Sequence, residues 1–175
     1  MITYQVMTEE QVGKLREIDR SEHIDLIYEI QHGEIIELRA DHECPSWDED
    51  LLHEMEGKYL LELRNGGMAI GAFDADTLVG FGVLAHQWRG EQQDRLQVDL
   101  MYVSRNYRRQ GIGTQIMRKL AEEAKQRGAK YLYISSTETR SAVSFYKSNG
   151  SQLTKDVDPE LFKKEPKDIH MLVEL

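Results

Sequence analysis

The segment Tyr107–Met117, which reads YRRQGIGTQIM, carries the residue types best suited to chemistry. Two arginines and two glycines come directly before an apolar run at helical spacing: Arg108, Arg109, Gly111 and Gly113. Glycine lets a backbone approach a ligand closely, and the free N–H groups of a helix start bind anions such as a pyrophosphate. Arginine adds positive charge for phosphates. The segment therefore predicts a phosphate-binding loop, with a structural glycine turn and solvated arginines as the alternative.

Three well-known phosphate loops fit this segment poorly. The dinucleotide fingerprint G-x-G-x-x-G needs a third glycine where this chain has Ile116. The glycine-rich loop of protein kinases needs the same third glycine. A P-loop needs a lysine directly after its second glycine, and none is present here. What remains is the pattern R-x-x-G-x-G between a strand and a helix.

The loop must be positioned by the elements around it, which hydrophobic periodicity predicts. Strands are expected at residues 2–7, 34–39, 68–73, 78–85, 96–103, 131–135 and 170–175. Helices are expected at residues 9–18, 47–56, 112–127 and 139–147. Residues 24–30 fit either a helix or a loose strand. In the strand before the loop, alternation predicts two faces, one with Leu96, Val98, Leu100 and Tyr102, the other with Gln97, Asp99, Met101 and Val103.

The order of these elements indicates the fold class. The strand–helix–strand unit over residues 96–135 implies one parallel pair of strands with a right-handed crossover. All other strands can pair by hairpins. We therefore expect an α/β (α+β) fold over residues 1–175 as a single domain, with a mixed, mostly antiparallel sheet, one parallel strand pair and helices on both faces.

Composition excludes several classes of protein. The 175 residues carry a formal charge of -9, from 22 Lys and Arg against 31 Asp and Glu, so nucleic-acid binding is disfavoured and a cationic substrate mildly favoured. No apolar run approaches the roughly 20 residues of a membrane span, and no secretory signal is visible. Cys44 is the only cysteine, so we expect a cytoplasmic protein without a disulfide framework or a metal site.

The loop and a second motif together resemble the GNAT superfamily of N-acyltransferases. The acyl-CoA signature of that family, [QR]-x-x-G-x-[GA], matches Arg108–Gly113 and follows a strand similar to Val98–Val103. A downstream family element, N-x-x-A-x-x-x-Y, is similar to Thr139–Tyr146, with Thr139 in place of the common asparagine. A further departure is Ser151, where phenylalanine is common.

The resemblance implies a division of labour along the chain. It covers about residues 68–151, which correspond to the acyl-CoA-binding core of the family. Residues 1–60 match only in the order of elements and correspond to the acceptor-side half, and residues 152–175 form a closing segment. Acetyl-CoA is the implied co-substrate, without a metal. The residues implied to bind it are Met101, Tyr102, Val103, Arg108, Arg109, Gln110, Gly111, Ile112, Gly113, Thr114, Thr139, Ala142 and Tyr146.

The implied reaction is direct attack of an amine on the thioester of acetyl-CoA. Tyr146 occupies the position of the family's usual general acid for the leaving thiolate. A primary amine is almost fully protonated at pH 7, so a base is also needed. Asp99, on the cofactor strand, is the first candidate for this base, with a structural ion pair as the alternative role. Glu138 is a weaker candidate, since a loop carboxylate is usually only solvated.

The acceptor is expected to be a small amine or a peptide amine, and the sequence does not choose between them. A homodimer is possible, with Met171–Leu175 as a candidate exposed edge strand. Two alternatives to the enzyme remain. One is a non-catalytic CoA-binding regulatory module of the same fold, and the other is a nucleotide-binding protein of another class.

Overall fold

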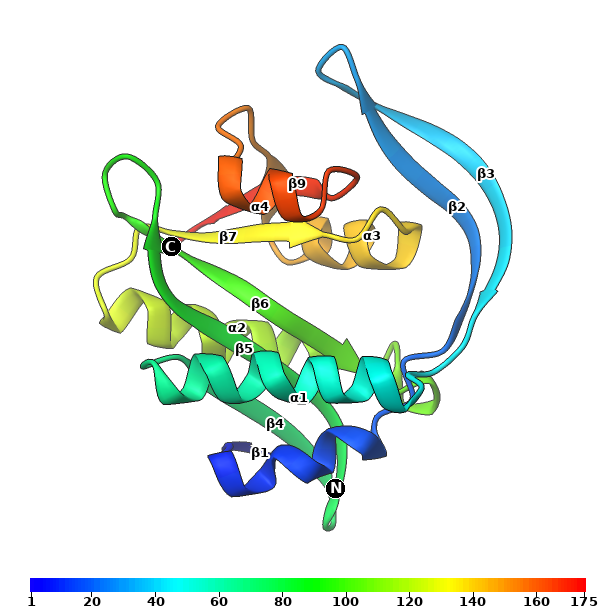
Figure 1. Ribbon diagram of the computed structural model, residues 1–175, viewed down its shortest axis with the longest axis vertical. Coiled ribbons are helices and arrows are strands. Elements are labelled where there is room, and N and C mark those ends of the chain that lie inside the picture. Colours follow the sequence, from blue (N-terminus) through cyan, green and yellow to red (C-terminus); the bar gives the residue numbers. More distant parts are fainter.

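The computed structural model describes residues 1–175, and its centre is a seven-stranded sheet in the order β1-β4-β5-β6-β7-β9-β8 (Figure 1). The strands are β1 (Ile2–Val6), β4 (Met68–Asp74), β5 (Thr77–Arg89), β6 (Arg95–Val103), β7 (Tyr131–Ser136), β8 (Ser151–Leu153) and β9 (Ile169–Glu174). Only β6 and β7 run parallel, and every other neighbouring pair is antiparallel. This arrangement confirms the predicted fold class.

Helices cover both faces of the sheet. The helices are the 3-10 helices η1 (Glu9–Glu17) and η2 (Arg105–Tyr107) and the α-helices α1 (Glu49–Arg64), α2 (Ile112–Gln126), α3 (Arg140–Ser148) and α4 (Pro159–Lys164). On the α1 face, Leu52 and Tyr59 pack in one core cluster with residues of η1, β4, β5 and β6. On the α2 face, Ile116 and Leu120 pack in a second, larger cluster that also takes Val143 from α3. Figure 1 shows α1 and α2 on opposite sides of the central strands.

The segment that sequence periodicity left ambiguous is a long β-hairpin. β2 (Glu22–Gln31) and β3 (Glu34–Cys44) form a separate two-stranded sheet. His32 and Gly33 join them with φ values of 51° and 78°, the left-handed conformation that two-residue hairpin turns require. The hairpin begins near the end of β6 and bows outward along one side of the sheet, past the start of α3, with its turn at the top of the view (Figure 1). Residues 24–30 are therefore strand.

The predicted alternation along β6 is wrong beyond Val98. Leu84 of β5 pairs with Val98, but the preceding Val83 pairs with Leu100, so Asp99 is an extra residue in β6. One extra residue moves every later side chain to the opposite face of a strand. Val98 accordingly belongs to the core of the α2 face, whereas Leu100 belongs to the core of the α1 face.

The expectation that Met171–Leu175 forms an exposed edge is also wrong. β9 lies inside the sheet, because β8 pairs with it from Ser151↔Val173 to Leu153↔Met171. Sequence periodicity missed β8 because three residues are too few to show an alternating pattern. It also missed the short helix α4.

The contact between β5 and α2 depends on Gly82. A Cβ atom at this position would lie 2.7 Å from Ile116 Cγ2 and 2.9 Å from Leu120 Cδ1. We expect Gly82→Ala to lower the free energy of unfolding by about 1–3 kcal/mol, because the added methyl overpacks the core. Gly57→Ala is the control, because Gly57 is an exposed residue of α1 and a Cβ atom there would have no atom within 4 Å. This variant should raise the free energy of unfolding by about 0.5–1 kcal/mol. Urea unfolding measures both, and a Gly82→Ala protein as stable as wild type would contradict the packing argument.

Candidate active site

The candidate site lies where β6 and β7 separate. Their pairing runs from Arg95↔Tyr131 to Val98↔Ile134 and ends there. Beyond this point the two strands diverge towards the hairpin (Figure 1). The β7-facing edge of β6 from Asp99 to Val103 therefore has no strand partner. Its backbone groups are available to a ligand that binds as an added strand. The predicted residues Met101, Tyr102 and Val103 all lie on this stretch.

The predicted phosphate loop follows directly after β6 and contains free backbone donors. Gly111 precedes α2 with φ 80°, and Arg109 is also left-handed with φ 62°. The N–H of Gln115 is the first of α2 to reach a helical acceptor, the carbonyl of Gly111 at 3.1 Å. The amides before it are the unsatisfied donors of a helix start, which suit a pyrophosphate. The loop therefore fits the phosphate end of coenzyme A.

Gly113 allows α3 to approach the start of α2. A Cβ atom at Gly113 would lie 2.7 Å from Cε1 of Phe145. The Thr139 hydroxyl caps α3 by accepting the N–H of Ala142 at 3.4 Å. The two predicted motifs, which lie on α2 and α3, are thus brought together by a direct contact.

Arg108 is held by backbone carbonyls rather than left free. Its guanidinium donates to Val103 O at 2.9 Å, Ser21 O at 2.9 Å and Asp19 O at 3.3 Å. These bonds tie the end of β6 to the segment that leads into the hairpin. Arg109 is exposed and makes no ion pair, so it is the arginine of this loop whose charge is available to a phosphate.

Tyr146 has the surroundings of a group that keeps its proton. Its half-buried side chain packs on the ring of Phe145, with centroids 5.2 Å apart, and its hydroxyl has no hydrogen-bond partner in the protein. Burial raises the pKa of Tyr146, and the nearby Tyr102 and Asp168 raise it further. The phenol is therefore neutral at physiological pH and can only donate a proton.

The two predicted base candidates lie on different elements. Asp99 is the bulge residue of β6, and its half-buried carboxyl has no hydrogen-bond or ion-pair partner. Burial raises the pKa of Asp99, the Glu62 charge adds to this, and Lys58 opposes it. Glu138 follows β7, and its backbone carbonyl accepts the N–H of Tyr28 in the hairpin at 2.7 Å.

A carboxyl that the sequence did not suggest lies near these groups. Asp168 precedes β9, and its Oδ2 accepts the hydroxyl of Ser135 from β7 at 2.8 Å. Burial raises the pKa of Asp168 to about 6; Glu165 and Glu138 also raise it, whereas the Ser135 hydrogen bond and Lys58 lower it. No motif includes Asp168, and only the pairing of β9 with β7 brings it to this place.

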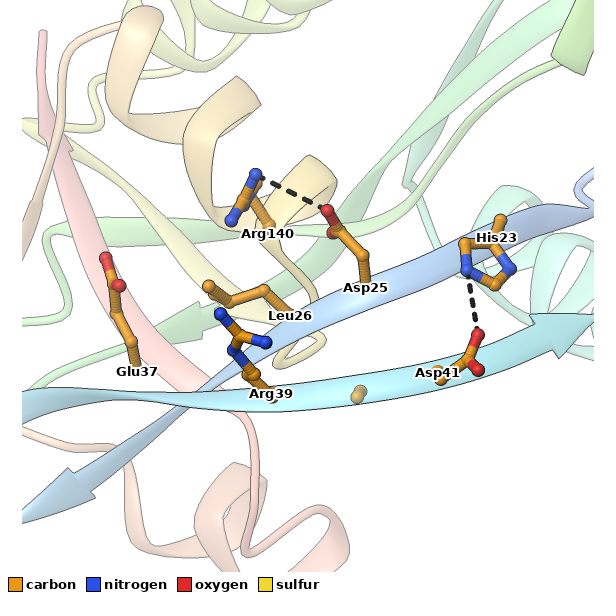
Figure 2. A pocket seen from close by; sticks show the side chains of 8 residues that line it. His23, Asp25, Leu26, Glu37, Arg39, Asp41 and Arg140 are labelled. Carbon is orange, nitrogen blue, oxygen red and sulfur yellow. Dashed lines mark ion pairs between the residues drawn. The ribbon is translucent and has the colours of Figure 1, made fainter.

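A pocket of about 680 Å³ lies between the hairpin and the start of α3 (Figure 2). Its charged side chains are largely paired, with Arg140 3.5 Å from Asp25 and His23 3.1 Å from Asp41. Neither Asp99, Asp168 nor Tyr146 lines this pocket. It is therefore separate from the groups gathered where β6 and β7 diverge.

The structure has no group of three or more His, Cys, Asp or Glu side chains placed to hold a metal ion. None of its helices combines the length and apolar character that crossing a membrane requires.

Comparison with known proteins identifies the family of the chain and solved structures with the same fold. Residues 27–150 match the family model described as the acetyltransferase (GNAT) family. No curated protein matches the chain by sequence. Solved structures do match across the whole fold.

Three of these structures are informative. A nourseothricin acetyltransferase has a TM-score of 0.75 at 19% identity, covering 99% of this chain and 98% of its own. A Bacillus anthracis protein assigned as a streptothricin acetyltransferase, in complex with acetyl coenzyme A, has a TM-score of 0.75 at 15% identity, covering 100% and 99%. The PaiA N-acetyltransferase of Thermoplasma acidophilum, in complex with coenzyme A, has a TM-score of 0.65 at 18% identity, covering 100% and 99%.

The two arginines of the loop should differ in their effect on stability. Arg108→Ala removes a guanidinium that donates hydrogen bonds to three backbone carbonyl oxygens. We expect the free energy of unfolding to fall by about 2 kcal/mol. Arg109→Ala is the matched control, because it removes the same charge from an exposed side chain, and it should stay within about 0.5 kcal/mol of wild type. Denaturant unfolding at one salt concentration measures both. Equal losses in the two variants would contradict a structural role for Arg108.

Proposed function

The chain belongs to the acetyltransferase (GNAT) family, and on that premise we propose that it transfers an acetyl group from acetyl-CoA to a primary amine by direct attack within a ternary complex. As a member of this family it is an acyl-CoA-dependent N-acyltransferase. The mechanism and the acceptor are the proposed parts. The observation that carries the proposal is the unpaired edge of β6, which leads directly into the phosphate loop.

Acetyl-CoA fits the residues present, and when bound it supplies an activated acetyl thioester. We assign the pyrophosphate to the free amides and exposed cation of the loop, formed by Arg108, Arg109, Gln110, Gly111, Ile112, Gly113 and Thr114. We assign the pantetheine arm to the free edge at Met101, Tyr102 and Val103, with Thr139 and Ala142 at the start of α3. A backbone N–H on this edge can also stabilise charge on the acetyl oxygen.

Two proton transfers fall to side chains of the chain. The acceptor ammonium must lose a proton before its nitrogen can form the new C–N bond. As the C–S bond breaks, Tyr146 gives its phenolic proton to the sulfur. Asp99 and Glu138 are the base candidates carried over from the sequence. Burial raises the pKa of Asp99, which brings its proton affinity nearer to that of an amine.

The charges near the site favour a cationic acceptor. Asp99, Asp168 and Glu138 are half-buried carboxyls close to the unpaired edge, and the whole chain carries a formal charge of -9. Such a field attracts a cation to the site. Two proteins of the same fold carry the names of nourseothricin and streptothricin acetyltransferases, so a streptothricin-class antibiotic belongs among the amines to be tested.

A binding and turnover experiment tests this function. Calorimetry with coenzyme A, NAD and ATP comes first, and we expect binding of coenzyme A alone. Release of coenzyme A is then followed with acetyl-CoA and a panel of small polyamines, a streptothricin, amino acids and peptides. Turnover with at least one amine is expected. Binding without any turnover would support a regulatory CoA-binding module, and binding of NAD or ATP alone would overturn the assignment.

Tyr146→Phe separates proton donation from packing. We expect the rate of acetyl transfer to fall tenfold or more, because the leaving sulfur loses its proton donor, while the affinity for coenzyme A changes little. Tyr131→Phe is the matched control. Tyr131 lies at the start of β7, away from the end that borders the site, and it contacts Arg95 through its ring, which phenylalanine keeps. Steady-state kinetics and calorimetry measure the two quantities. Full turnover in Tyr146→Phe would reject the assigned role.

A further inference from the structure

We infer that Asp168 is the catalytic base of this acetyltransferase, taking the proton from the acceptor amine directly or through one water. The inference rests on the proposed acyl transfer and replaces the two base candidates that the sequence offers. Four features of the structure carry it. The first two are the position of Ser135 on β7 and the hydrogen bond that its hydroxyl donates to Asp168. The other two are the closeness of Asp168 to Tyr146 and the lack of a cation paired with Asp168.

Ser135 is the first residue of β7 beyond the last pair with β6. That pair is Val98↔Ile134, and Ile134 points into the core of the α2 face. Because strand side chains alternate, Ser135 points to the α1 face. Its hydroxyl donates to Asp168 Oδ2 at 2.8 Å, so the carboxyl is held beside the point where the strands diverge.

The backbone also fixes Asp168 at this point. β7 and β9 pair through Ser135↔His170 and Ser136↔Ile169, directly next to Asp168. The carboxyl is thus positioned by a sheet register and a side-chain hydrogen bond, both from the strand that borders the site. A base has to be held in this way, because the proton it takes must lie within hydrogen-bond reach.

Asp168 lies close to the acid as well. Apart from burial, the groups that raise the pKa of Tyr146 are Tyr102 and Asp168. Tyr102, on the β6 side of the divergence, is affected by both Asp99 and Asp168. Asp168 therefore raises the pKa of a tyrosine on each side of the gap between β6 and β7. A base and an acid that serve the same acetyl group must share such a space.

No cation neutralises Asp168. Its carboxylate accepts the Ser135 hydroxyl and makes no ion pair. The charged groups that face it are Lys58 from α1, Glu138 from the end of β7 and Glu165 from the preceding loop. Burial is the largest effect, and together they raise the pKa of Asp168 to about 6. The group is therefore ionised at neutral pH and more basic than an ordinary carboxylate, as a general base should be.

The proton and electron balance is simple. The Asp168 carboxylate takes one proton from the acceptor ammonium and becomes a neutral carboxylic acid. The freed nitrogen lone pair forms the C–N bond to the acetyl carbon, and the C–S bond breaks. Tyr146 gives its proton to the sulfur. The attacking nitrogen still carries two protons, and it passes one of them to the Tyr146 phenolate as the amide forms. Asp168 returns its proton to solvent.

The pH dependence of kcat/KM tests the role of Asp168. Wild type should lose activity below about pH 6, where Asp168 becomes protonated. Asp168→Asn should remove this acid limb and lower kcat/KM at pH 8 about 100-fold. Ser135→Ala should move the limb upward by about one pH unit, because the carboxylate loses the hydrogen bond that stabilises its charge. The amine itself titrates near pH 10 and is the same in all variants.

Matched variants separate this role from a structural one. Ser136→Ala is the control for Ser135→Ala, because Ser136 is the next residue of β7 and donates to the carbonyl of Thr137 at 2.8 Å, so its variant should keep the wild-type limb. Asp168→Glu should recover part of the activity lost in Asp168→Asn. Asp99→Asn should keep the limb at its wild-type pH, whatever its rate. Affinity for coenzyme A confirms that each variant is folded.

Three outcomes would overturn the inference. If wild type turns over and the acid limb stays in place in both Asp168→Asn and Ser135→Ala, Asp168 is not the base, and the proposed function stands. If the limb disappears in Asp99→Asn instead, the base is Asp99. Failure of wild type to acetylate any amine would reject the proposed function itself, together with the role of Asp168.

Discussion

The separation of β6 from β7 is the constraint on which the rest of the site depends. The two parallel strands pair over only four residues each. Beyond these pairs, the backbone donors and acceptors on their facing edges have no strand partner. Such groups cost free energy unless they are satisfied, so the gap favours a ligand that supplies the missing strand. The bulge at Asp99 supports the divergence, because an extra residue increases the local twist of β6. The phosphate loop, α3 and the Ser135–Asp168 pair all lie at the borders of this one gap.

The hairpin connects the two sides of this gap. Arg108 ties its entry segment to the end of β6, and Arg105 donates to Glu43 in β3 at 2.7 Å. At the other side, Ser141 of α3 donates to Glu22 in β2 at 2.8 Å. The hairpin and its entry segment are thus bonded to both elements that carry the two sequence motifs. Arg108, the arginine of the loop motif, contributes by holding the backbone in place. Its guanidinium donates to three backbone carbonyl groups, so its charge is not free for a phosphate.

The sequence predicted what is encoded locally and missed what depends on long-range pairing. The left-handed turn at Gly111, the helix after it and the helix that carries Tyr146 follow from short motifs, and they agree with the structure. The bulge at Asp99 depends on the register with β5, which no periodicity within β6 can reveal. Asp168 was missed for the same reason, since the residue that holds it lies 33 positions earlier in the chain. Residues 24–30 were ambiguous because Leu26 and Ile27 are adjacent and both apolar, and a register shift between Ile24 and Leu26 breaks the alternation that identifies a strand.

In the proposed mechanism, burial acts in the same direction on Asp168, on Tyr146 and on the leaving thiolate, and this makes the two proton transfers compatible. Desolvation raises the pKa of Asp168, so the carboxylate binds the proton of an amine more readily than an exposed one would. Desolvation also raises the pKa of Tyr146, which alone would make it a weaker acid. A thiolate formed in the same surroundings is destabilised too, and its pKa rises with that of the phenol. Because both pKa values rise, burial by itself does not oppose the proposed transfer of the proton from oxygen to sulfur. An ion pair at Asp168 would lower its pKa and lose the first advantage, which is why the absence of a paired cation there matters more to the chemistry than the number of nearby acids.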